Sequence, residues 1–453
     1  MLYRVIIGNY KSFADQSQFD MFPNLKRENF INHVYTDDAV PVLKECAIYG
    51  ANGSGKSNFI QALRFVKGFA TSFDLNADKS AAISFYNKYR FRLPVFHDNR
   101  PMSFLVEFST NLKSYIYIVE LDNKGISEES LYISGLGKEE NKKLFTRRYG
   151  EVRFGDGIAT REIMDVFSRQ IEANPSLSVL GIIGKLHLVD NKHIKAAYKW
   201  LDDNLDVIEV DSQIPWLIQQ FGRQPDMMKF VRKVFKEIGL GLSDLSIRTE
   251  SFDQWLQHAE AEDKSLISKF MESGSKDTGN LAIAKMDRQF PHLTITDADG
   301  EKQVQELIFT QLGRNGYKGE MECATQSVGT LRLLTLVPAI YFAMNEGKTV
   351  MIDEINNSIH PMLIKQLIRF FCTSKTDGQL IFTTHETALL NQQELLRPDE
   401  VWLMEKIDGA TKMYSLNDFK IHKTVSLENG YLDGRYRAIP FIGNLDLLDD
   451  GLE

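Results

Sequence analysis

Short apolar stretches that alternate with helical segments mark both ends of the chain. Residues 3–7 and 44–49 have the length and composition of strands, and the second runs directly into a glycine-rich turn. Residues 58–69 follow with apolar side chains at helical spacing. The C-terminal part repeats this alternation of helices and strands at 327–346, 348–355, 360–374, 379–383 and 400–405. Strands that alternate with helices in this way are typical of a parallel sheet.

The middle of the chain has different patterns. The β-rich segments 103–108, 114–120 and 126–133 predict an antiparallel meander. From about residue 156 to residue 272 the periodicity is helical, without heptads sustained over many turns. Within this region, residues 258–280 are polar, and we expect them to be exposed and mobile.

These patterns predict an α/β domain that is interrupted by an insertion. A hairpin-like segment at 292–310, with the turn sequence DADG, begins the return to the α/β pattern. We therefore predict the N-terminal part of the domain at 1–150, a mainly helical insertion at 151–290 and the C-terminal part at 291–453. The two ends are expected to complete one sheet, and the insertion to be a compact lobe and not a coiled-coil arm.

The composition of the chain limits which cellular compartment and which binding partners are expected. The 453 residues are 43% hydrophobic and 25% charged, with a formal net charge of −8. This acidic balance argues against a surface for tight non-specific binding of nucleic acid, although it leaves local basic grooves open. The longest apolar run, 333–344, is too short to cross a bilayer, and no long apolar core follows the first strand. We expect a cytoplasmic protein without a membrane partner.

The three cysteines give no sign of metal or disulfide chemistry. Cys46, Cys323 and Cys372 are far apart and have no C-x-x-C spacing. This predicts neither a disulfide framework nor a zinc site, and it fits a reducing compartment.

Residues 50–57 read GANGSGKS and match the pattern G-x-x-x-x-G-K-[ST] completely. The match lies between a predicted strand and a predicted helix, where backbone N–H groups and the helix dipole can bind phosphates. Lys56 is expected to reach the β- and γ-phosphates and Ser57 to ligate Mg²⁺. The alternative is a chance glycine turn. The residues predicted to bind the nucleotide here are Gly50, Asn52, Gly53, Ser54, Gly55, Lys56, Ser57 and Asn58.

An apolar strand at 348–352 ends in two acids, Asp353 and Glu354. Asp353 is expected to hold Mg²⁺ through water, and Glu354 to polarise the attacking water as general base. The alternative is that the two acids only cap a strand. Downstream, the strand 379–383 leads to His385, which can donate to a γ-phosphate, or else be satisfied by local hydrogen bonds.

Ser327 and Gly329, in the sequence QSVGT, precede a long apolar helix. A small Ser-x-Gly at a helix N-terminus is an anion site, and the alternative is a plain N-cap at Ser327.

The order GANGSGKSN, QSVGT, VMIDEINNSIHP and FTTHE resembles ABC-type ATPases, the group that includes SMC proteins and Rad-fifty-like heads. More narrowly, the chain resembles the bacterial AAA-fifteen and AAA-twenty-one ATPase domains, in its opening IIGNYKSF and its late segments LRPDEVWLMEK and ENGYLDGRYRAIP as well. The resemblance covers about half of the chain. Gln326 and Ile359 depart from the usual residues, and the change at Gln326 removes a charge beside the signature serine.

The resemblance implies the fold, the cofactors and a first partner. It implies an ABC-type head, with a P-loop sheet, an antiparallel β subdomain and an insertion. It also implies ATP and Mg²⁺ as cofactors and ATP hydrolysis as the expected activity. Ser327 and Gly329 would act on the ATP of a second copy, so a homodimer or a higher assembly of dimers is expected. Residues 356–360 would line that interface, and Lys11, Ser12 and Phe13 would lie near the nucleotide.

Many proteins that resemble this group act in bacterial defence against phage, together with a separate effector such as a nuclease. The size and the compact insertion favour the sensor ATPase of a PARIS-type system over a Septu-like one. Under this hypothesis the ATP-bound heads hold a toxic partner, such as a Toprim-type or HNH nuclease, until a phage product releases it.

Three alternatives stand beside that hypothesis. An overcoming-lysogenisation-type nuclease would need a further acid cluster, and we interpret Asp449 and Asp450 as part of a solvated acidic end, so we expect no nuclease activity in this chain. An SMC- or Rad-fifty-like ATPase in DNA repair would need long coiled-coil arms or a basic groove. Residues 144–154 contain two adjacent arginines that could contact a phosphate backbone, but we interpret this segment as a solvated strand face. A transporter ATPase has a much shorter spacing between the cradle and the signature.

Overall fold

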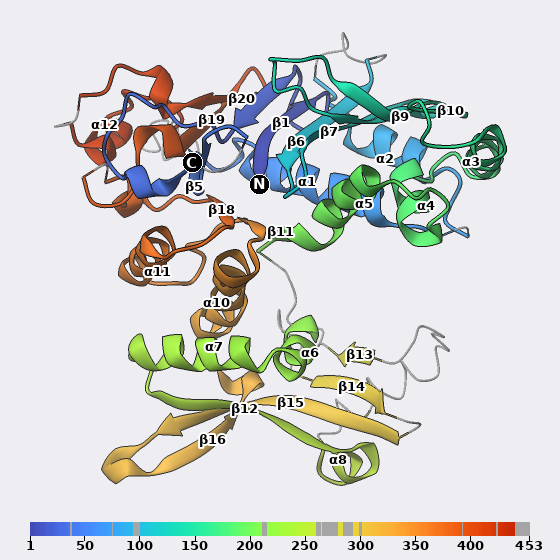
Figure 1. The fold of residues 1–453 in the computed structure, drawn as a ribbon. Coiled ribbons are helices and arrows are strands. Elements are labelled where there is room, and N and C mark those ends of the chain that lie inside the picture. Colours follow the sequence, from blue (N-terminus) through green and yellow to red (C-terminus); the bar gives the residue numbers. More distant parts are fainter. Residues whose placement is uncertain are drawn as a thin grey trace, which may run out of the picture. The chain divides into compact units, whose positions relative to one another are not determined.

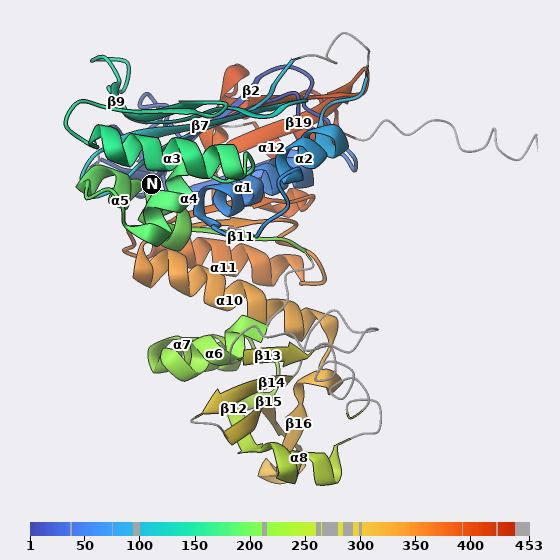
Figure 2. The ribbon, with the colours of Figure 1, turned by 90° about the vertical axis from the view of Figure 1, so that its right-hand side faces the viewer.

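The computed structural model describes two compact units, coloured along the chain in Figures 1 and 2. The first, here called the head, comprises 1–209, 343–356 and 365–453; the second, here called the lobe, comprises 210–342 and 357–364. The described residues are 1–36, 39–74, 76–93, 100–210, 215–259, 264, 280–283, 293–298, 301–391, 393–422 and 425–439. Most of the polar stretch at 258–280 and the acidic end, with Asp449 and Asp450, lie outside them.

The head contains a six-stranded sheet built from distant parts of the chain. Its strands, in spatial order, are β11 (Leu205–Ile208), β17 (Thr349–Ile352), β18 (Gln379–Thr383), β5 (Glu45–Gly50), β19 (Val401–Ile407) and β20 (Ala410–Ser415). The first five are parallel, and β20 closes the edge as a hairpin with β19. Because β5 lies between β18 and β19, the two ends of the chain complete one sheet, as predicted.

A seven-stranded antiparallel sheet forms the second layer of the head. Its strands, in spatial order, are β10 (Glu151–Phe154), β9 (Lys142–Arg148), β8 (Gly125–Ile133), β7 (Ser114–Asp122), β6 (Met102–Ser109), β1 (Leu2–Gly8) and β2 (Ser17–Asp20). The predicted meander is confirmed as β6, β7 and β8. A small separate ladder joins β3 (Val34–Tyr35) to β4 (Val42–Leu43).

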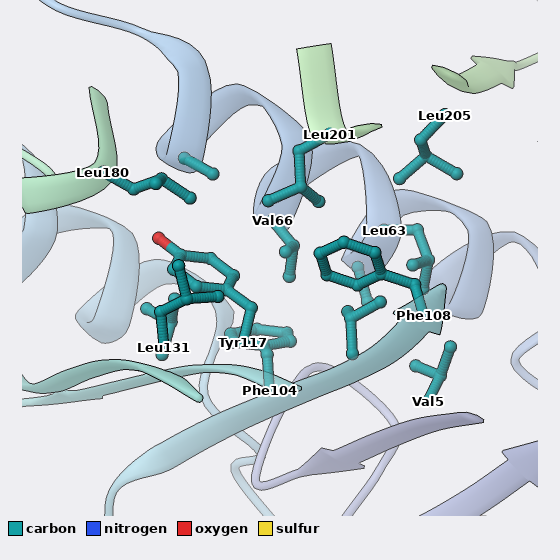
Figure 3. Close-up of a cluster of buried hydrophobic side chains, with 14 of the residues drawn as sticks. Val5, Leu63, Val66, Phe104, Phe108, Tyr117, Leu131, Leu180, Leu201 and Leu205 are labelled. Carbon is teal, nitrogen blue, oxygen red and sulfur yellow. The ribbon is translucent and has the colours of Figure 1, made fainter. Parts of the chain in front are cut away.

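Helix α1 (Lys56–Thr71) supplies much of the core of the head. Its side chains Leu63 and Val66 face Phe104, Phe108 and Tyr117 of the antiparallel sheet in Figure 3. Each such fully buried side chain contributes about 1.5–3 kcal/mol of transfer free energy. The remaining helices of the head are α2 (Ala81–Tyr89), α3 (Arg161–Ala173), α4 (Val179–Leu186), α5 (Lys192–Lys199) with the π-helical turn Trp200–Asn204, and α12 (Leu427–Leu432).

The boundaries of the predicted insertion need correction. Helices α3 to α5 and strand β11 were assigned to it, yet residues 151–209 belong to the head. Their buried side chains explain this, because Phe167, Leu180 and Leu201 join the same core as α1. Figure 2 shows α3, α4 and α5 gathered beside α1. The second unit therefore begins at residue 210 and not at residue 151.

The lobe is also less helical than predicted. It holds a five-stranded antiparallel sheet of β12 (Leu242–Ser251), β15 (Glu301–Leu312), β14 (Leu293–Ala298), β13 (Asn280–Ile283) and β16 (Lys318–Glu322). Its helices are α6 (Pro215–Arg223), α7 (Pro225–Glu237) and α8 (Phe252–His258). Strand β12 was not predicted, because most of its side chains are polar and only Leu242 and Leu245 are buried. The hairpin expected at 292–310 is confirmed as β14 and β15.

Two long helices link the lobe to the head along the chain. These are α10 (Val328–Glu346) and α11 (Pro361–Thr373). By length and composition alone α10 could cross a membrane, but 67% of its apolar window is buried inside the protein, as in a core helix. Short 3₁₀ turns lie at Ile31–His33, Arg314–Gly316, Cys323–Thr325, Thr387–Leu389, Pro398–Glu400 and Leu416–Asp418.

A buried ion pair ties the antiparallel sheet to α4. The Glu129 carboxylate accepts hydrogen bonds from Tyr117 Oη (3.0 Å), Ser178 Oγ (2.8 Å) and the backbone N–H of residues 179 and 180. Arg147 lies 3.8 Å away and donates to the carbonyl oxygens of residues 149, 175 and 177. Arg147 is only 1% exposed, so the prediction that it belongs to a solvated strand face is wrong.

This network leads to a stability prediction. Glu129→Gln should lower the free energy of unfolding by about 2–4 kcal/mol, because it leaves the buried Arg147 guanidinium without a counter-charge. Denaturant unfolding followed by circular dichroism measures this loss. Glu128→Gln, on the same strand, is the control and should cost less than about 1 kcal/mol. Equal costs for the two variants would contradict this account.

Candidate nucleotide site

The loop between β5 and α1 forms a cradle that requires glycine at two positions, Gly50 and Gly55. A Cβ atom added at Gly50 would lie 2.3 Å from the carbonyl oxygen of Met404, and one at Gly55 would lie 2.3 Å from Thr411 Oγ1. Gly55 also has a φ of 113°, which disfavours any side chain. No side chain of the described residues caps the first turn of α1. Its N–H groups therefore remain available to an anion, and the macrodipole favours one there.

The cradle holds one buried ammonium group. Lys56 Nζ donates to the carbonyl oxygens of Gly50 (2.8 Å) and Ala51 (3.3 Å), and it lies 2.9 Å from His385 Nε2. Burial lowers the pKa of Lys56 to about 8, although Glu354 and Asp353 act in the opposite direction. Burial and the neighbouring Lys56 charge lower the pKa of His385. At neutral pH, a charged Lys56 can therefore donate to a neutral His385.

Thr383, at the end of β18, fixes both acids that follow β17. Its hydroxyl donates to Asp353 Oδ1 (2.6 Å) and accepts from the backbone N–H of Glu354 (2.8 Å). Asp353 is 4% exposed, whereas Glu354 is half-buried and has a φ of 46°. The buried acid is thus held rigidly, while its neighbour remains open to water. The importance of Thr383 was missed, although parallel strands place it beside the acids.

Asn356 positions the histidine on the same edge of the sheet. Its Oδ1 accepts from Thr384 Oγ1 (2.8 Å) and from the backbone N–H of His385 (3.4 Å). The structure therefore brings the acids, the histidine and the lysine of the cradle together in the head.

The segment after the first strand is tied to the cradle by Thr411 of β20, a residue that the motifs did not indicate. Thr411 Oγ1 lies 2.7 Å from the carbonyl oxygen of Ser54 and 2.8 Å from Ser12 Oγ. Ser12 Oγ also accepts from Asn58 Nδ2 (2.8 Å). Ser54 Oγ is buried without a hydrogen-bond partner among the described residues, which is typical of a site shaped for a polar ligand. Ser57 is half-buried, and Asn52 and Gly53 are exposed.

The Ser-x-Gly motif lies in the lobe. Ser327 is exposed, and its Oγ accepts from the backbone N–H of Thr330 (3.2 Å), so it caps α10 as the simpler alternative predicts. A Cβ atom at Gly329 would lie 2.6 Å from the carbonyl oxygen of Ser358. The motif therefore packs closely against the loop at 357–360, within the lobe.

The comparisons with known proteins identify the family. Residues 46–391, more than half of the chain, match the model of the AAA-twenty-one family, described as "AAA domain, putative AbiEii toxin, Type IV TA system". The chain belongs to this family. As a member it has the AAA domain of an ATPase, with the α/β ABC-type fold that the sequence predicts. None of the curated proteins matches the chain.

Solved structures of SMC heads are similar to this AAA-twenty-one member. One is an SMC head bound to the C-terminal winged-helix domain of ScpA, at 14% identity and a TM-score of 0.44, covering 92% of this chain and 99% of that one. Another is the SMC head from Thermotoga maritima, at 12% identity and a TM-score of 0.39, covering 93% and 99%. A third, from Pyrococcus furiosus, is an SMC head with an extended coiled coil, bound to the C-terminal domain of ScpA. It has 15% identity and a TM-score of 0.36, covering 96% and 99%.

The lowered pKa of Lys56 predicts a pH dependence of nucleotide affinity. Above a pKa of about 8, ATP can bind only if Lys56 takes up a proton, so the Kd should rise about tenfold from pH 7 to pH 9. Calorimetry with a non-hydrolysable ATP analogue, in buffers of different ionisation enthalpy, measures both the Kd and the proton uptake. Lys56→Arg keeps its charge and should show no such slope. A flat profile for the unmodified chain would contradict the prediction.

The contacts of Thr383 predict an effect on turnover. Thr383→Val removes the hydroxyl that holds Asp353 and Glu354, so kcat for ATP hydrolysis should fall about tenfold to a hundredfold. Thr349→Val is a matched control, because Thr349 is equally buried but hydrogen-bonds Gln379 at the other end of these strands. A steady-state phosphate-release assay compares the two variants. If both lost kcat equally, Thr383 would have no special part in the site.

Proposed function

We propose that the head hydrolyses ATP with Mg²⁺, with Lys56, Asp353, Glu354 and His385 as the acting residues. The observation that carries this proposal is the convergence of one buried ammonium group, two acids and one histidine beside the glycine cradle. Lys56 would bind the β- and γ-phosphates, and His385 would donate to the γ-phosphate. Ser57 and Asp353 offer the hydroxyl and carboxylate oxygens that Mg²⁺ prefers, and the metal would neutralise phosphate charge.

Glu354 is the group placed for general-base catalysis. It is open to solvent, while the position of its backbone is fixed through Thr383. Its carboxylate would accept a proton from the water that attacks the γ-phosphorus as the bond to the bridging oxygen of ADP breaks. Asp353, buried and already accepting a hydrogen bond, is less suited to that role.

The second part of the proposal is a site shared by two copies of the chain. Ser327 is exposed, and the adjacent Val328 is 52% exposed despite its apolar side chain. An exposed Ser-x-Gly at the start of a 19-residue helix can receive a phosphate from another molecule. Ser327 and Gly329 would thus complete the ATP site of the partner, and ATP would drive dimerisation or assembly of dimers.

The third part concerns the biological role. The family description names a putative toxin of a type IV toxin–antitoxin system, and the sequence resembles ATPases of phage defence. We propose a cytoplasmic sensor and scaffold of the PARIS kind, which holds a separate toxic effector, such as a Toprim-type or HNH nuclease, until a phage product triggers release.

A DNA-binding ATPase of the SMC or Rad-fifty type is the alternative. The net charge of −8 weighs against it, and so does Arg147, which is buried and therefore unavailable to a phosphate backbone. A mobility-shift assay across salt concentrations separates the two functions, because counterion release makes DNA binding strongly salt-dependent.

The experiment that tests the proposal combines mass with turnover. Glu354→Gln should bind ATP but lose nearly all hydrolysis, so that ATP with Mg²⁺ shifts its mass to that of a dimer or a larger assembly. Light scattering with and without the nucleotide measures the mass, and phosphate release measures the steady-state rate. Glu151→Gln, an exposed change on β10, is the control and should hydrolyse ATP normally.

The possible outcomes test separately the role of Glu354 as general base and the sharing of the ATP site between two copies of the chain. Hydrolysis at the unmodified rate would remove Glu354 from catalysis. A monomer that binds ATP without hydrolysing it would leave Glu354 as the base but overturn the shared site, and Ser327 would then be only a helix cap.

A further inference from the structure

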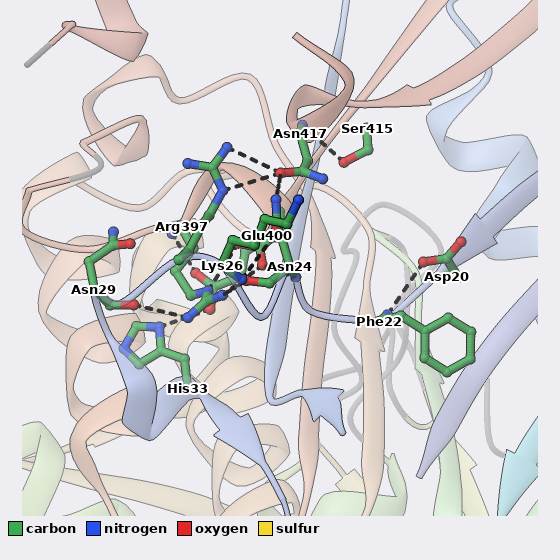
Figure 4. Close-up of polar contacts among 12 residues, drawn as sticks. Asp20, Phe22, Asn24, Lys26, Asn29, His33, Arg397, Glu400, Ser415 and Asn417 are labelled. Carbon is green, nitrogen blue, oxygen red and sulfur yellow. Dashed lines mark hydrogen bonds and ion pairs between the residues drawn. The ribbon is translucent and has the colours of Figure 1, made fainter. Parts of the chain in front are cut away.

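Four ionisable side chains meet inside the head, at the end of β5 opposite to the cradle. Glu45 begins β5, and His33 ends the 3₁₀ turn Ile31–His33. Cys372 lies in the last turn of α11, and Glu400 ends the 3₁₀ turn before β19. The chain thus brings together four segments that are far apart in sequence. Figure 4 shows His33 beside Glu400.

The donor atoms of this cluster are close together and fully enclosed. His33 Nδ1 lies 2.9 Å from Glu400 Oε1 and 3.3 Å from Glu45 Oε1. The ligand atoms of His33, Glu45 and Cys372 all lie within 4.8 Å of one another. His33 is 3% exposed, Cys372 2%, and both glutamates 0%.

The cluster is not satisfied by its own hydrogen bonds. Both carboxylate oxygens of Glu45 are buried without a hydrogen-bond partner among the described residues. Two carboxyl groups face one imidazole in this enclosed space, and a buried acceptor without a donor costs about 1–3 kcal/mol.

We propose that His33, Glu45, Cys372 and Glu400 form a closed structural zinc site. Nitrogen, sulfur and carboxylate oxygen are the donors that Zn²⁺ binds, and four ligands complete its tetrahedron. With zinc bonds of about 2.0–2.3 Å, tetrahedral ligand atoms lie about 3.3–3.7 Å apart. The separation of His33 Nδ1 from Glu45 is already in that range, and the separation from Glu400 needs to open by a few tenths of an ångström.

Neighbouring groups hold the ligands as zinc requires. The backbone N–H of Arg397 donates to Glu400 Oε2 (2.6 Å), which leaves Oε1 directed at His33. The four proposed ligands come from four separate segments, so no C-x-x-C spacing would indicate such a site in the sequence.

The site would fasten β5 to α11 and to the start of β19. This function is separate from ATP hydrolysis, since the cluster lies at the far end of β5 from Gly50. Zinc would stabilise the sheet that carries the cradle without touching the nucleotide.

The test measures metal in the full chain, purified without a histidine tag and without added ATP. Elemental analysis should find about one zinc per chain. Cys372→Ser and His33→Gln should lose most of it, whereas Cys323→Ser, a buried cysteine of the lobe, should keep it. Chelation should lower the Tm of the unmodified chain and leave that of Cys372→Ser unchanged.

Cobalt substitution keeps the proposal testable even if a variant fails to fold. The unmodified chain refolded with Co²⁺ should show a thiolate-to-cobalt charge-transfer band and the visible d–d bands of a tetrahedral site. If the chain contained less than about one tenth of a zinc and showed no thiolate band, the cluster would be a proton-sharing network and the zinc site would be wrong. Another metal at the same ratio would overturn the assignment to zinc.

Discussion

The parallel pairing of β5 with both β18 and β19 is the constraint on which the rest of the head depends. Gly50, the last residue of β5, pairs with Met404 of β19, and Thr383 of β18 pairs with Ile48. These pairings fix where the cradle begins and where the acid-bearing edge lies. No contact local in sequence could do so, because the strands are separated by more than 300 residues. The site exists only when both ends of the chain have folded into one sheet.

Close packing around the cradle adds a second constraint. Gly50 and Gly55 allow β19 and β20 to approach the loop to distances that exclude any Cβ atom. Thr411 can therefore reach the carbonyl oxygen of Ser54 and, through Ser12, the start of α1. The cradle is thus held from outside by the C-terminal hairpin, and its first-turn N–H groups need not be capped. A loop preorganised in this way loses little entropy when an anion binds.

The sequence could predict features that are encoded in short continuous segments, but not those that depend on contacts between residues far apart in the chain. The cradle is a continuous motif between a strand and a helix, and the acids and His385 end apolar strands, so these elements were predictable from short windows. The α/β class followed from the same alternation. The roles of Thr411 and Thr383 could not be predicted from the sequence, because they arise only from contacts across the sheet. Strand β11 and the boundary at residue 210 were missed because helical periodicity does not indicate which core a helix joins.

The chain path connects the two candidate halves of the mechanism. Asp353 and Glu354 belong to the head, and three residues after Glu354 the chain enters the loop that packs against Gly329 in the lobe. Ser358 in that loop has a φ of 59°, and Glu354 has a φ of 46°, so both positions hold conformations that side chains disfavour. Asn356 accepts a hydrogen bond from the backbone N–H of His385 and is the last residue of the head before that loop. Along the chain, only a few residues therefore separate the acids from the loop that packs against the Ser-x-Gly motif.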